Sequence, residues 1–416
     1  MKNFMYSIGK KAIIASKKKI NSKLKDKVLD QYINLIRKNK KLIIKQNNKD
    51  IKLAVEKKLK VNLIDRLTID QKKINNMCAA IKNVRKLKDP IDVTLEKWKR
   101  PNNLLIKKVS IPLGVIGIIF ESRPNVASDV SSLCFKSGNA VILKGGSEAL
   151  NSNKILVSLF RKALKKNKID ANYVQLIEKK KRNYVNFMLS SMSKYIDVII
   201  PRGGKNLVTK VKKFSKIPTI SHLEGICHTY LDKDADLKMA TKVIHNAKLR
   251  NTSICGATET ILMHKKIIKK FCNPILNKLA TNNCKIIGDR YLKKYYKGKL
   301  FLAKEKDWST EYLSATVSVK CVKNIESAIE HINKYGTMHT DSIITKNKKS
   351  ANKFLKNVNS SIAIHNSSTQ FADGGEFGFG GEVGLSTNKL PPRGPVGLKQ
   401  LVSYKYELLG QGQIRK

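Results

Sequence analysis

The chain has 416 residues, of which 41% are hydrophobic, and it carries a formal net charge of +52. This length and apolar content are sufficient for a large buried core and predict two or three globular domains. No apolar run is long enough to cross a bilayer, so we expect a soluble, cytoplasmic protein with no membrane partner.

The positive charge is spread along the chain. Lysine occurs in nearly every predicted helix, and aromatic residues make up only 6% of the chain. A nucleic-acid-binding protein would concentrate its charge and interleave aromatic side chains for stacking on bases. We therefore attribute the charge to a general enrichment of lysine at exposed positions and expect no specific nucleic-acid partner, although the field will attract small anions.

The seven cysteines are scattered and include no C-x-x-C pair. This distribution argues against a disulfide framework and against a zinc cluster, and it fits a reducing compartment. No metal site is predicted. The cysteines are Cys78, Cys134, Cys227, Cys255, Cys272, Cys284 and Cys321.

The N-terminal part, up to about Trp98, is predicted to form amphipathic helices. Its first segment is rich in lysine, whereas organellar targeting peptides favour arginine, so we interpret it as the first helix of the fold. A long helical pattern follows, through Val28, Tyr32, Ile33, Ile36 and Leu42. These helices supply a scaffold and no evident chemistry.

From residue 115 onward, apolar strands, glycine turns and helices alternate. The predicted strands are 115–120, 140–143, 174–177 and 198–200, and the predicted helices include one through Val126, Val130 and Cys134 and two at 151–166 and 205–214. Repetition of strand, turn and helix predicts an α/β fold with a parallel sheet and a ligand at its carboxyl edge.

Two glycine turns lead into predicted helices, at Gly145-Gly146 and at Gly203-Gly204. A helix N-terminus behind such a turn offers backbone N–H groups and a favourable dipole to a phosphate. Neither turn matches G-x-G-x-x-G or the P-loop pattern, so ordinary turn chemistry is the alternative. The glycine cluster from Gly374 to Gly384 does not join a strand to a helix and is predicted to be a structured loop.

Cys255 is placed between a helix and a strand. The helix carries apolar residues from Leu237 to Ala247 and should end near Lys248, and the strand runs from Thr258 to Met263. The cysteine then lies in a tight turn, where the following glycine permits close approach of another group. This arrangement suits a nucleophile, and the alternative is a buried structural cysteine.

A series of segments in fixed order covers essentially the whole chain. They are PLGVIGIIFESRPNV from Pro112, SGNAVILKGGSEA from Ser137, IPRGGKNLV from Ile200, HLEGICHTYLDKDAD from His222, ICGATET, DWSTEYLS from Asp307, YGTMHTDSIIT from Tyr335, GGEFGFGGEVGLST and RGPVGL. In these segments the chain resembles the aldehyde dehydrogenase superfamily and, within it, the γ-glutamyl phosphate reductase family. The HTD triplet and RGPVGL are typical of that family.

The resemblance implies an aldehyde dehydrogenase-like α/β fold, with a Rossmann-like parallel-sheet cofactor domain, an α/β catalytic domain and a small β oligomerisation element. We place the helical start of the cofactor domain at 1–98, an oligomerisation hairpin at 99–111 and the rest of the cofactor domain at 112–235. The catalytic domain is expected at 236–366, and a return segment with the oligomerisation tail at 367–416. A homo-oligomer is expected.

The resemblance also assigns catalytic roles. Cys255 matches the nucleophile, and Asn125 matches the asparagine whose side-chain amide forms an oxyanion hole with the backbone N–H of Cys255. A thiolate needs positive potential nearby and an oxyanion needs fixed donors, so the chemistry agrees with both roles. The candidate substrate-binding residues are Arg123, His339, Thr340, Asp341 and Arg393.

The implied cofactor is NADPH or NADP. Lys144 matches a lysine that contacts the adenosine ribose and its phosphate, and a 2′-phosphate requires a cation. Glu311 matches the acid that binds the nicotinamide ribose. Phosphate contacts are expected from Gly145, Ser147, Gly203 and Gly204.

The activity implied by the resemblance is reduction of L-glutamyl 5-phosphate to L-glutamate 5-semialdehyde through a cysteine thioester, the second step of proline synthesis from glutamate. Functional coupling to glutamate 5-kinase is expected. Hydrolytic relatives carry a glutamate that activates water, and in this chain its position falls on His222, with Glu224 close by. We therefore expect oxidation of the semialdehyde to require phosphate or arsenate.

Two positions depart from the family pattern, because Asn251 and Gln370 stand where arginine is common. A bidentate contact to substrate is lost there or replaced by a neighbouring lysine. Two rival classes stay open. Another superfamily enzyme, CoA-acylating or hydrolytic, would lack the HTD and RGPVGL segments, and a basic nucleic-acid-binding protein would bind DNA with a steep salt dependence.

Overall fold

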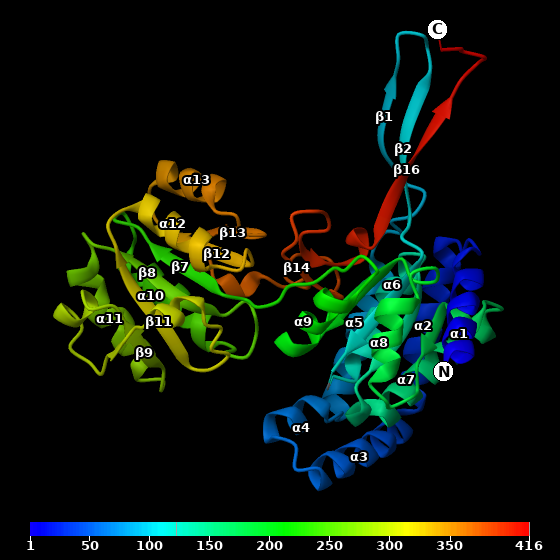
Figure 1. Ribbon diagram of the computed structural model, residues 1–416, viewed down its shortest axis with the longest axis horizontal. Coiled ribbons are helices and arrows are strands. Elements are labelled where there is room, and N and C mark those ends of the chain that lie inside the picture. Colours follow the sequence, from blue (N-terminus) through cyan, green and yellow to red (C-terminus); the bar gives the residue numbers. More distant parts are fainter. Residues whose placement is uncertain (122, 416) are drawn as a thin grey trace. The chain divides into compact units, whose positions relative to one another are not determined.

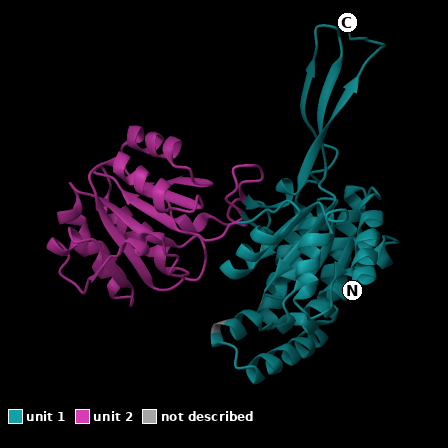
Figure 2. Cartoon of the chain, viewed as in Figure 1, with its two compact units in different colours: residues 1–221, 378–385, 395–416 teal, residues 222–377, 386–394 magenta. Residues whose placement is uncertain are grey.

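The structure is a computed structural model that describes residues 1–121 and 123–415. It divides into two compact units, drawn in different colours in Figure 2. Unit 1 contains residues 1–221, 378–385 and 395–416, and unit 2 contains residues 222–377 and 386–394.

The chain enters unit 2 earlier than the predicted boundary between residues 235 and 236. Strand β7 (Cys227–Leu231) hydrogen-bonds in parallel with β8 (Thr258–His264) and β12 (Thr340–Ile344), so it belongs to the sheet of unit 2. The return to unit 1 begins at residue 378 instead of the predicted 367. The pairings of β7 join distant segments, which explains why the sequence pattern misplaced the first boundary.

Unit 1 opens with five helices: α1 (Lys2–Ser16), α2 (Ser22–Lys38), α3 (Lys40–Glu56), α4 (Val61–Leu67) and α5 (Gln71–Lys86). The predicted long helical pattern breaks at Asn39, whose side-chain amide donates to the carbonyl of Leu35 at 2.8 Å and so satisfies the end of α2. Leu42, beyond this break, is 40% exposed, whereas Val28 and Ile36 on α2 are buried as predicted.

The main sheet of unit 1 has the strand order β5-β4-β3-β6, and all its pairings are parallel. Every residue of β3 and β4 is buried, as expected for strands covered on both faces. The predicted strands and helices of this region are confirmed to within two residues at each end. The elements are β3 (Val115–Phe120), α6 (Asn125–Lys136), β4 (Ala140–Gly145), α7 (Leu150–Lys166), β5 (Val174–Leu176), α8 (Asn183–Ser191), β6 (Val198–Arg202) and α9 (Lys205–Phe214).

A separate antiparallel sheet extends from unit 1, as Figure 1 shows. It consists of β1 (Thr94–Lys99), β2 (Leu105–Pro112) and β16 (Val402–Leu409), with β2 in the centre. The first strand therefore begins at Thr94, not at the predicted residue 99. Helix α5 already ends at Lys86, shortly before Pro90, and proline disfavours helical continuation.

Unit 2 contains a parallel sheet of seven strands in the order β10-β9-β11-β8-β7-β12-β13. The remaining strands are β9 (Lys285–Gly288), β10 (Phe301–Leu302), β11 (Thr316–Val322) and β13 (Ile362–His365), and the helices are α10 (Leu237–Leu249), α11 (Ile268–Ala280), α12 (Ile325–Tyr335) and α13 (Lys348–Asn357).

The helices of unit 2 lie along the faces of this sheet (Figure 1), and the packing of alternate β8 side chains shows which helices cover each face. Ile261 and Met263 pack in one core with residues of α10 and α11. Leu262, between them, packs in another core with residues of α12 and α13. Because successive strand residues point to opposite faces, the two helix pairs lie on opposite sides of the sheet.

The glycine-rich segment forms turns over residues 374–379 and ends at a short pair of strands, β14 (Gly384–Ser386) and β15 (Gly394–Val396). None of the seven cysteines, all of which lie in the described residues, forms a disulfide, as predicted. Among the helices that the structure describes, none has both the length and the apolarity needed to cross a bilayer.

Candidate active site

Cys255 lies in unit 2, between α10 and β8, as predicted. Its turn is closed by a hydrogen bond of 3.0 Å from the N–H of Ala257 to the carbonyl of Ile254. Cys255 is half-buried, whereas β8, which begins at Thr258, is buried throughout. The fold therefore places this thiol at the end of a rigid strand and leaves it partly accessible.

A second backbone segment approaches the Cys255 turn at Gly225. A Cβ at Gly225 would lie 2.0 Å from the carbonyl oxygen of Cys255, so any larger residue would displace the turn. The thiol of Cys227 donates to the same carbonyl, with Sγ 3.1 Å from the oxygen. The close approach that we predicted at Gly256 is less tight, because a Cβ there would lie 3.2 Å from the carbonyl oxygen of Thr369.

Two histidines lie beside Cys255. One side-chain ligand atom from each of His222, Cys255 and His339 lies within 4.8 Å of the other two. The two imidazole rings meet edge to face, with centroids 5.2 Å apart. Burial, followed by the charge of His222, lowers the pKa of His339 well below its ordinary value and keeps this ring neutral. The sequence associated His339 with substrate, but the structure brings it to the nucleophile.

The other members of the HTD triplet face the protein interior. The hydroxyl of Thr340 lies 2.9 Å from Nδ1 of His339. Oδ1 of Asp341 accepts the backbone N–H of His228 at 2.7 Å and lies 2.8 Å from Nδ1 of His228. Asp341 is 1% exposed. Asp341 therefore links β12 to β7, and its predicted contact with substrate stays a prediction.

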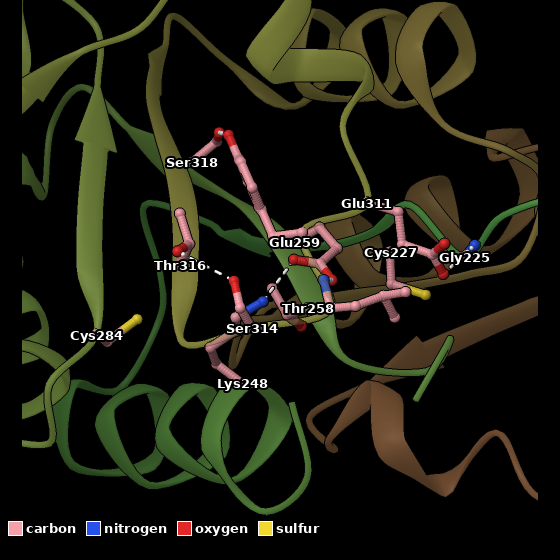
Figure 3. Close-up of polar contacts among 12 residues, drawn as sticks. Gly225, Cys227, Lys248, Thr258, Glu259, Cys284, Glu311, Ser314, Thr316 and Ser318 are labelled. Atoms are coloured by element: carbon pink, nitrogen blue, oxygen red, sulfur yellow. Dashed lines mark hydrogen bonds and ion pairs between the residues drawn. The ribbon is translucent and has the colours of Figure 1, made fainter. Parts of the chain in front are cut away.

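Glu311 also contacts the segment that approaches the nucleophile. Its Oε1 accepts the N–H of Gly225 at 2.9 Å (Figure 3). The loop that carries Glu311 is held by the carboxylate of Glu259, which accepts the N–H of Leu313 at 3.3 Å. Leu313 has a positive φ of 51°, a conformation that needs such support.

Glu259 forms a fully buried ion pair with Lys248, which Figure 3 shows beside the Glu311 loop. Burial raises the pKa of Glu259 to about 7, although the charge of Lys248 and their hydrogen bond act in the opposite direction. The pair connects the last turn of α10 to β8, so it also fixes the two elements that flank Cys255.

Gln370 has a defined structural role. Its Oε1 accepts the Nε–H of Arg250 at 2.8 Å, and its Nε2 donates to the carbonyl of Ala247 at 2.8 Å. A Cβ at Gly256 would lie 3.6 Å from Cα of Gln370, so the backbone of Gln370 packs against the Cys255 turn. Arg250 is an exposed cation at this position that the sequence analysis missed. Its only sequence signal was its place directly before Asn251.

Asn125 and its surroundings belong to unit 1. The amide Nδ2 of Asn125, at the start of α6, donates to Oδ2 of Asp129 at 3.0 Å. Burial raises the pKa of Asp129 to about 6, while the hydrogen bonds from Asn125 and Ser128 act to lower it. The amide of Asn125 is thereby oriented, with one N–H left to donate. Its place in an oxyanion hole stays a prediction.

Lys144 is buried at the carboxyl end of β4, where its ammonium group donates to the carbonyl of Gly145 at 2.8 Å. Burial lowers its pKa. Ser147 is exposed and begins the short 3₁₀ helix that leads into α7. A Cβ at Gly145 would lie 2.3 Å from Nδ2 of Asn153, a buried amide without a hydrogen-bond partner among the described residues.

The turn at Gly203 and Gly204 lies beside a carboxylate. The N–H of Gly204 donates to Oε2 of Glu121 at 3.1 Å. A phosphate at this turn would have to displace that carboxylate from the N–H, and the predicted phosphate contact stays a prediction. Of the candidate substrate cations, Arg123 is exposed in unit 1, and exposed Arg393 in unit 2 donates to the carbonyl of Asn359.

Residues 10–293 match the aldehyde dehydrogenase family. A gamma-glutamyl phosphate reductase from Caldanaerobacter subterraneus is 44% identical over 410 residues, which cover 98% of this chain and 99% of the relative. The chain belongs to the γ-glutamyl phosphate reductase family. A reductase of this name from Bartonella quintana is 44% identical and covers 95% of this chain and 96% of its own.

The solved structures agree with this membership. The crystal structure of gamma-glutamyl phosphate reductase from Thermotoga maritima has a TM-score of 0.96 and 39% identity, over 99% of both chains. An acetylating aldehyde dehydrogenase from Geobacillus thermoglucosidasius shares the fold, with a TM-score of 0.70 at 15% identity, over 100% of this chain and 98% of its own. The predicted family and fold class are both confirmed.

Proposed function

We propose that this member of the γ-glutamyl phosphate reductase family reduces L-glutamyl 5-phosphate to L-glutamate 5-semialdehyde and phosphate, the second step of proline synthesis from glutamate. The observation that carries this proposal is the half-buried Cys255, presented on a tight turn within reach of His222 and His339, in a chain 44% identical to proteins of that name. Cys255 is the nucleophile.

The reaction begins when the Cys255 thiolate attacks the acyl carbon of the substrate. The bond from this carbon to the phosphate oxygen breaks, phosphate leaves, and a thioester remains on Cys255. NADPH, when bound, supplies the hydride that reduces this thioester. The sulfur–carbon bond then breaks, the aldehyde departs and the thiol is restored.

The two histidines beside Cys255 set the protonation state of its sulfur atom. His222 is half-buried and accepts the thiol proton, while the neutral ring of His339 lies beside the sulfur. No glutamate stands where a hydrolytic relative has its water-activating base, so water does not cleave the thioester. During reduction the thioester reacts with hydride, and during oxidation of the semialdehyde it reacts with phosphate.

Arg250 binds an anionic group of the substrate. Its Nε–H is taken by Gln370, which fixes the plane of the guanidinium and leaves its terminal nitrogens for a carboxylate or a phosphate. Arg250, oriented by Gln370, would therefore supply the positive charge that an arginine at residue 370 would otherwise provide.

The residues around β4 fit an NADPH phosphate. Lys144 is buried at this turn, where the nearby charge of Glu148 favours its ammonium form, and the unpaired amide of Asn153 lies next to the same turn. Lys144 would hold the 2′-phosphate and Ser147 would donate to it. Glu311 would accept from the nicotinamide ribose while it keeps its contact to Gly225.

Oligomerisation is proposed to use the β1-β2-β16 sheet, where all six residues of β1 are exposed. Its exposed large apolar side chains are those of Leu95, Trp98, Tyr404, Tyr406, Leu408 and Leu409. Coupling to glutamate 5-kinase would shorten the exposure of an unstable acyl phosphate to water.

One assay tests the reaction: formation of NADPH from the semialdehyde and NADP, followed with and without phosphate. We expect turnover to require phosphate or arsenate and to be lost in Cys255→Ala. Dependence on coenzyme A, or steady release of free glutamate without phosphate, would instead assign the chain to a different activity within the superfamily.

A further inference from the structure

His222, Cys255 and His339 have the composition of a transition-metal site. They offer two imidazole nitrogens and one sulfur, and these three atoms lie within 4.8 Å of one another. They come from three separate segments of unit 2: the entry segment before β7, the turn before β8 and the start of β12. The fold therefore brings together ligands that the sequence shows far apart.

A second observation points to a ligand at this place. His339 is fully buried, and its Nε2 has no hydrogen-bond partner among the described residues. Its Nδ1 is engaged, at 2.9 Å from the hydroxyl of Thr340 and 3.4 Å from Sγ of Cys227. A buried ring nitrogen left unpaired is costly unless something binds it. Metal-binding histidines commonly have this arrangement, with the second nitrogen fixed by a neighbouring polar group.

We propose that His222, Cys255 and His339 bind a divalent zinc ion. The bound ion inhibits the enzyme, because the zinc-bound thiolate cannot attack the substrate. Zinc prefers nitrogen and sulfur ligands, with bonds of about 2.0–2.3 Å, so tetrahedral ligand atoms lie roughly 3.5 Å apart. Each ligand must therefore move by about an ångström from its present position. His222 and Cys255 are half-buried, so the movement falls to these two ligands, while His339 stays anchored through Nδ1.

Metal binding exchanges a proton for the ion. The S–H bond of Cys255 breaks, a zinc–sulfur bond forms, and the proton passes to the buffer, while both imidazoles bind in their neutral form. Three protein ligands leave one position of a tetrahedral ion for water or an anion. No electron is transferred, so the ion is removed by a chelator and the thiol returns unchanged.

The inhibition rests on the proposed role of Cys255 as nucleophile, but the metal site does not. The site can therefore be tested without any turnover. Co²⁺ serves as a spectroscopic probe, because a four-coordinate cobalt–thiolate centre has visible d–d bands and a near-ultraviolet charge-transfer band that requires a sulfur ligand.

The experiment titrates the full-length apoprotein with Co²⁺, without substrate or cofactor. We expect both sets of bands to saturate at one ion per chain and Zn²⁺ to displace the cobalt. Cys255→Ser should abolish the charge-transfer band, and His339→Gln should weaken Co²⁺ binding at least about tenfold, since one of three ligands is lost. Circular dichroism establishes that each variant is folded.

Cys321→Ser is the matched control, since Cys321 is the other half-buried cysteine and lies on β11. This variant should keep the cobalt spectrum and the activity. Absence of the charge-transfer band, its persistence in Cys255→Ser, or its loss in Cys321→Ser would each overturn the proposed site.

Activity is measured separately. Zn²⁺ should inhibit turnover at the concentration at which it displaces cobalt, and EDTA should restore the full rate. If the cobalt spectrum were normal but the zinc-loaded enzyme remained active, the metal site would be supported and the catalytic role of Cys255 would be contradicted. The two proposals therefore fail in distinguishable ways.

Discussion

At the scale of single residues, the structure explains how two polar side chains of unit 1 are prepared for their proposed roles. Asn125 gives one N–H of its amide to Asp129, which orients the other. Lys144 rests on the carbonyl of Gly145 and is largely buried. Both side chains are held in place by neighbours on their own elements.

We predict that Asn125→Ala lowers kcat about 100- to 1000-fold, the usual cost of removing one oxyanion donor. Steady-state kinetics at saturating substrate measure this loss. Asp129→Ala should cost about tenfold, because it releases Asn125 without removing it, and Asp129→Asn should recover part of the rate by restoring an acceptor. If Asp129→Ala were slower than Asn125→Ala, Asp129 would have a role of its own.

For Lys144→Met we predict a rise of about tenfold or more in the KM for NADPH and little change in the KM for NADH. The methionine keeps the apolar stem and removes only the charge, and only NADPH carries the 2′-phosphate. Initial rates with each cofactor provide the comparison. An equal change for both would show that Lys144 does not contact the 2′-phosphate.

At the scale of the elements, rigid contacts position the nucleophile. The segment before β7 approaches the carbonyl of Cys255 at Gly225, and Glu311 binds the N–H of the same glycine. The buried pair of Lys248 and Glu259 joins α10 to β8 on either side of the turn. The geometry of Cys255 therefore depends on two other loops and on one buried ion pair as well as on its own turn.

Gly225→Ala should reduce kcat/KM at least about 100-fold, since a displacement of an ångström can cost that much in a positioned nucleophile. The added methyl would lie 2.0 Å from the carbonyl oxygen of Cys255. Gly204→Ala is the control, because a Cβ there meets nothing within 4 Å and its φ of −71° suits any residue. Comparable losses in both variants would contradict this explanation.

The Glu259 carboxyl predicts a specific pH dependence of stability. Its pKa rises from 4.5 to about 7 on folding, so folding favours the protonated form. Its contribution is complete below pH 4.5 and is lost as the pH rises toward 7. Relative to Glu259→Gln, the wild type should lose on the order of 3 kcal/mol of unfolding free energy across this window.

Chemical denaturation of both proteins at several pH values, followed by a signal from unit 2, measures this difference. The glutamine variant is the matched control because it keeps an oxygen acceptor for the N–H of Leu313. A difference that stays constant from pH 4.5 to 7 would show that Glu259 does not titrate as described.

Some of the elements could be predicted from the sequence because their local pattern is unambiguous. Strands β3 and β4 are continuous apolar runs, and the structure buries each residue of both. Strand β1 is exposed along its whole length and carries no such pattern, so it was predicted as helix. The position of Cys255 between α10 and β8 was predictable for the same local reason.

At the scale of the whole molecule, three unpredicted features depend on contacts between distant segments. The boundary at residue 222 follows from pairing of β7 with β8 and β12. The location of His339 beside Cys255 follows from the same sheet, and the pairing of Arg250 with Gln370 joins α10 to the segment after β13. Local periodicity holds no information on such contacts.

The net charge of +52 is another property of the whole chain. Lysines lie on helices of both units. Specific binding of a nucleic acid is not expected for a member of this family. Two anionic ligands, an acyl phosphate and a dinucleotide, would be attracted by such a field, and this attraction weakens as salt is added.

The central claim is that Cys255 carries the acyl group between phosphate and hydride. Its most direct test is mass spectrometry of the acid-quenched enzyme after incubation with the semialdehyde and NADP in phosphate-free buffer. The account predicts a γ-glutamyl adduct on the peptide that contains Cys255, discharged on addition of phosphate. An enzyme that turns over without this adduct, or that carries it on another residue, would contradict the account.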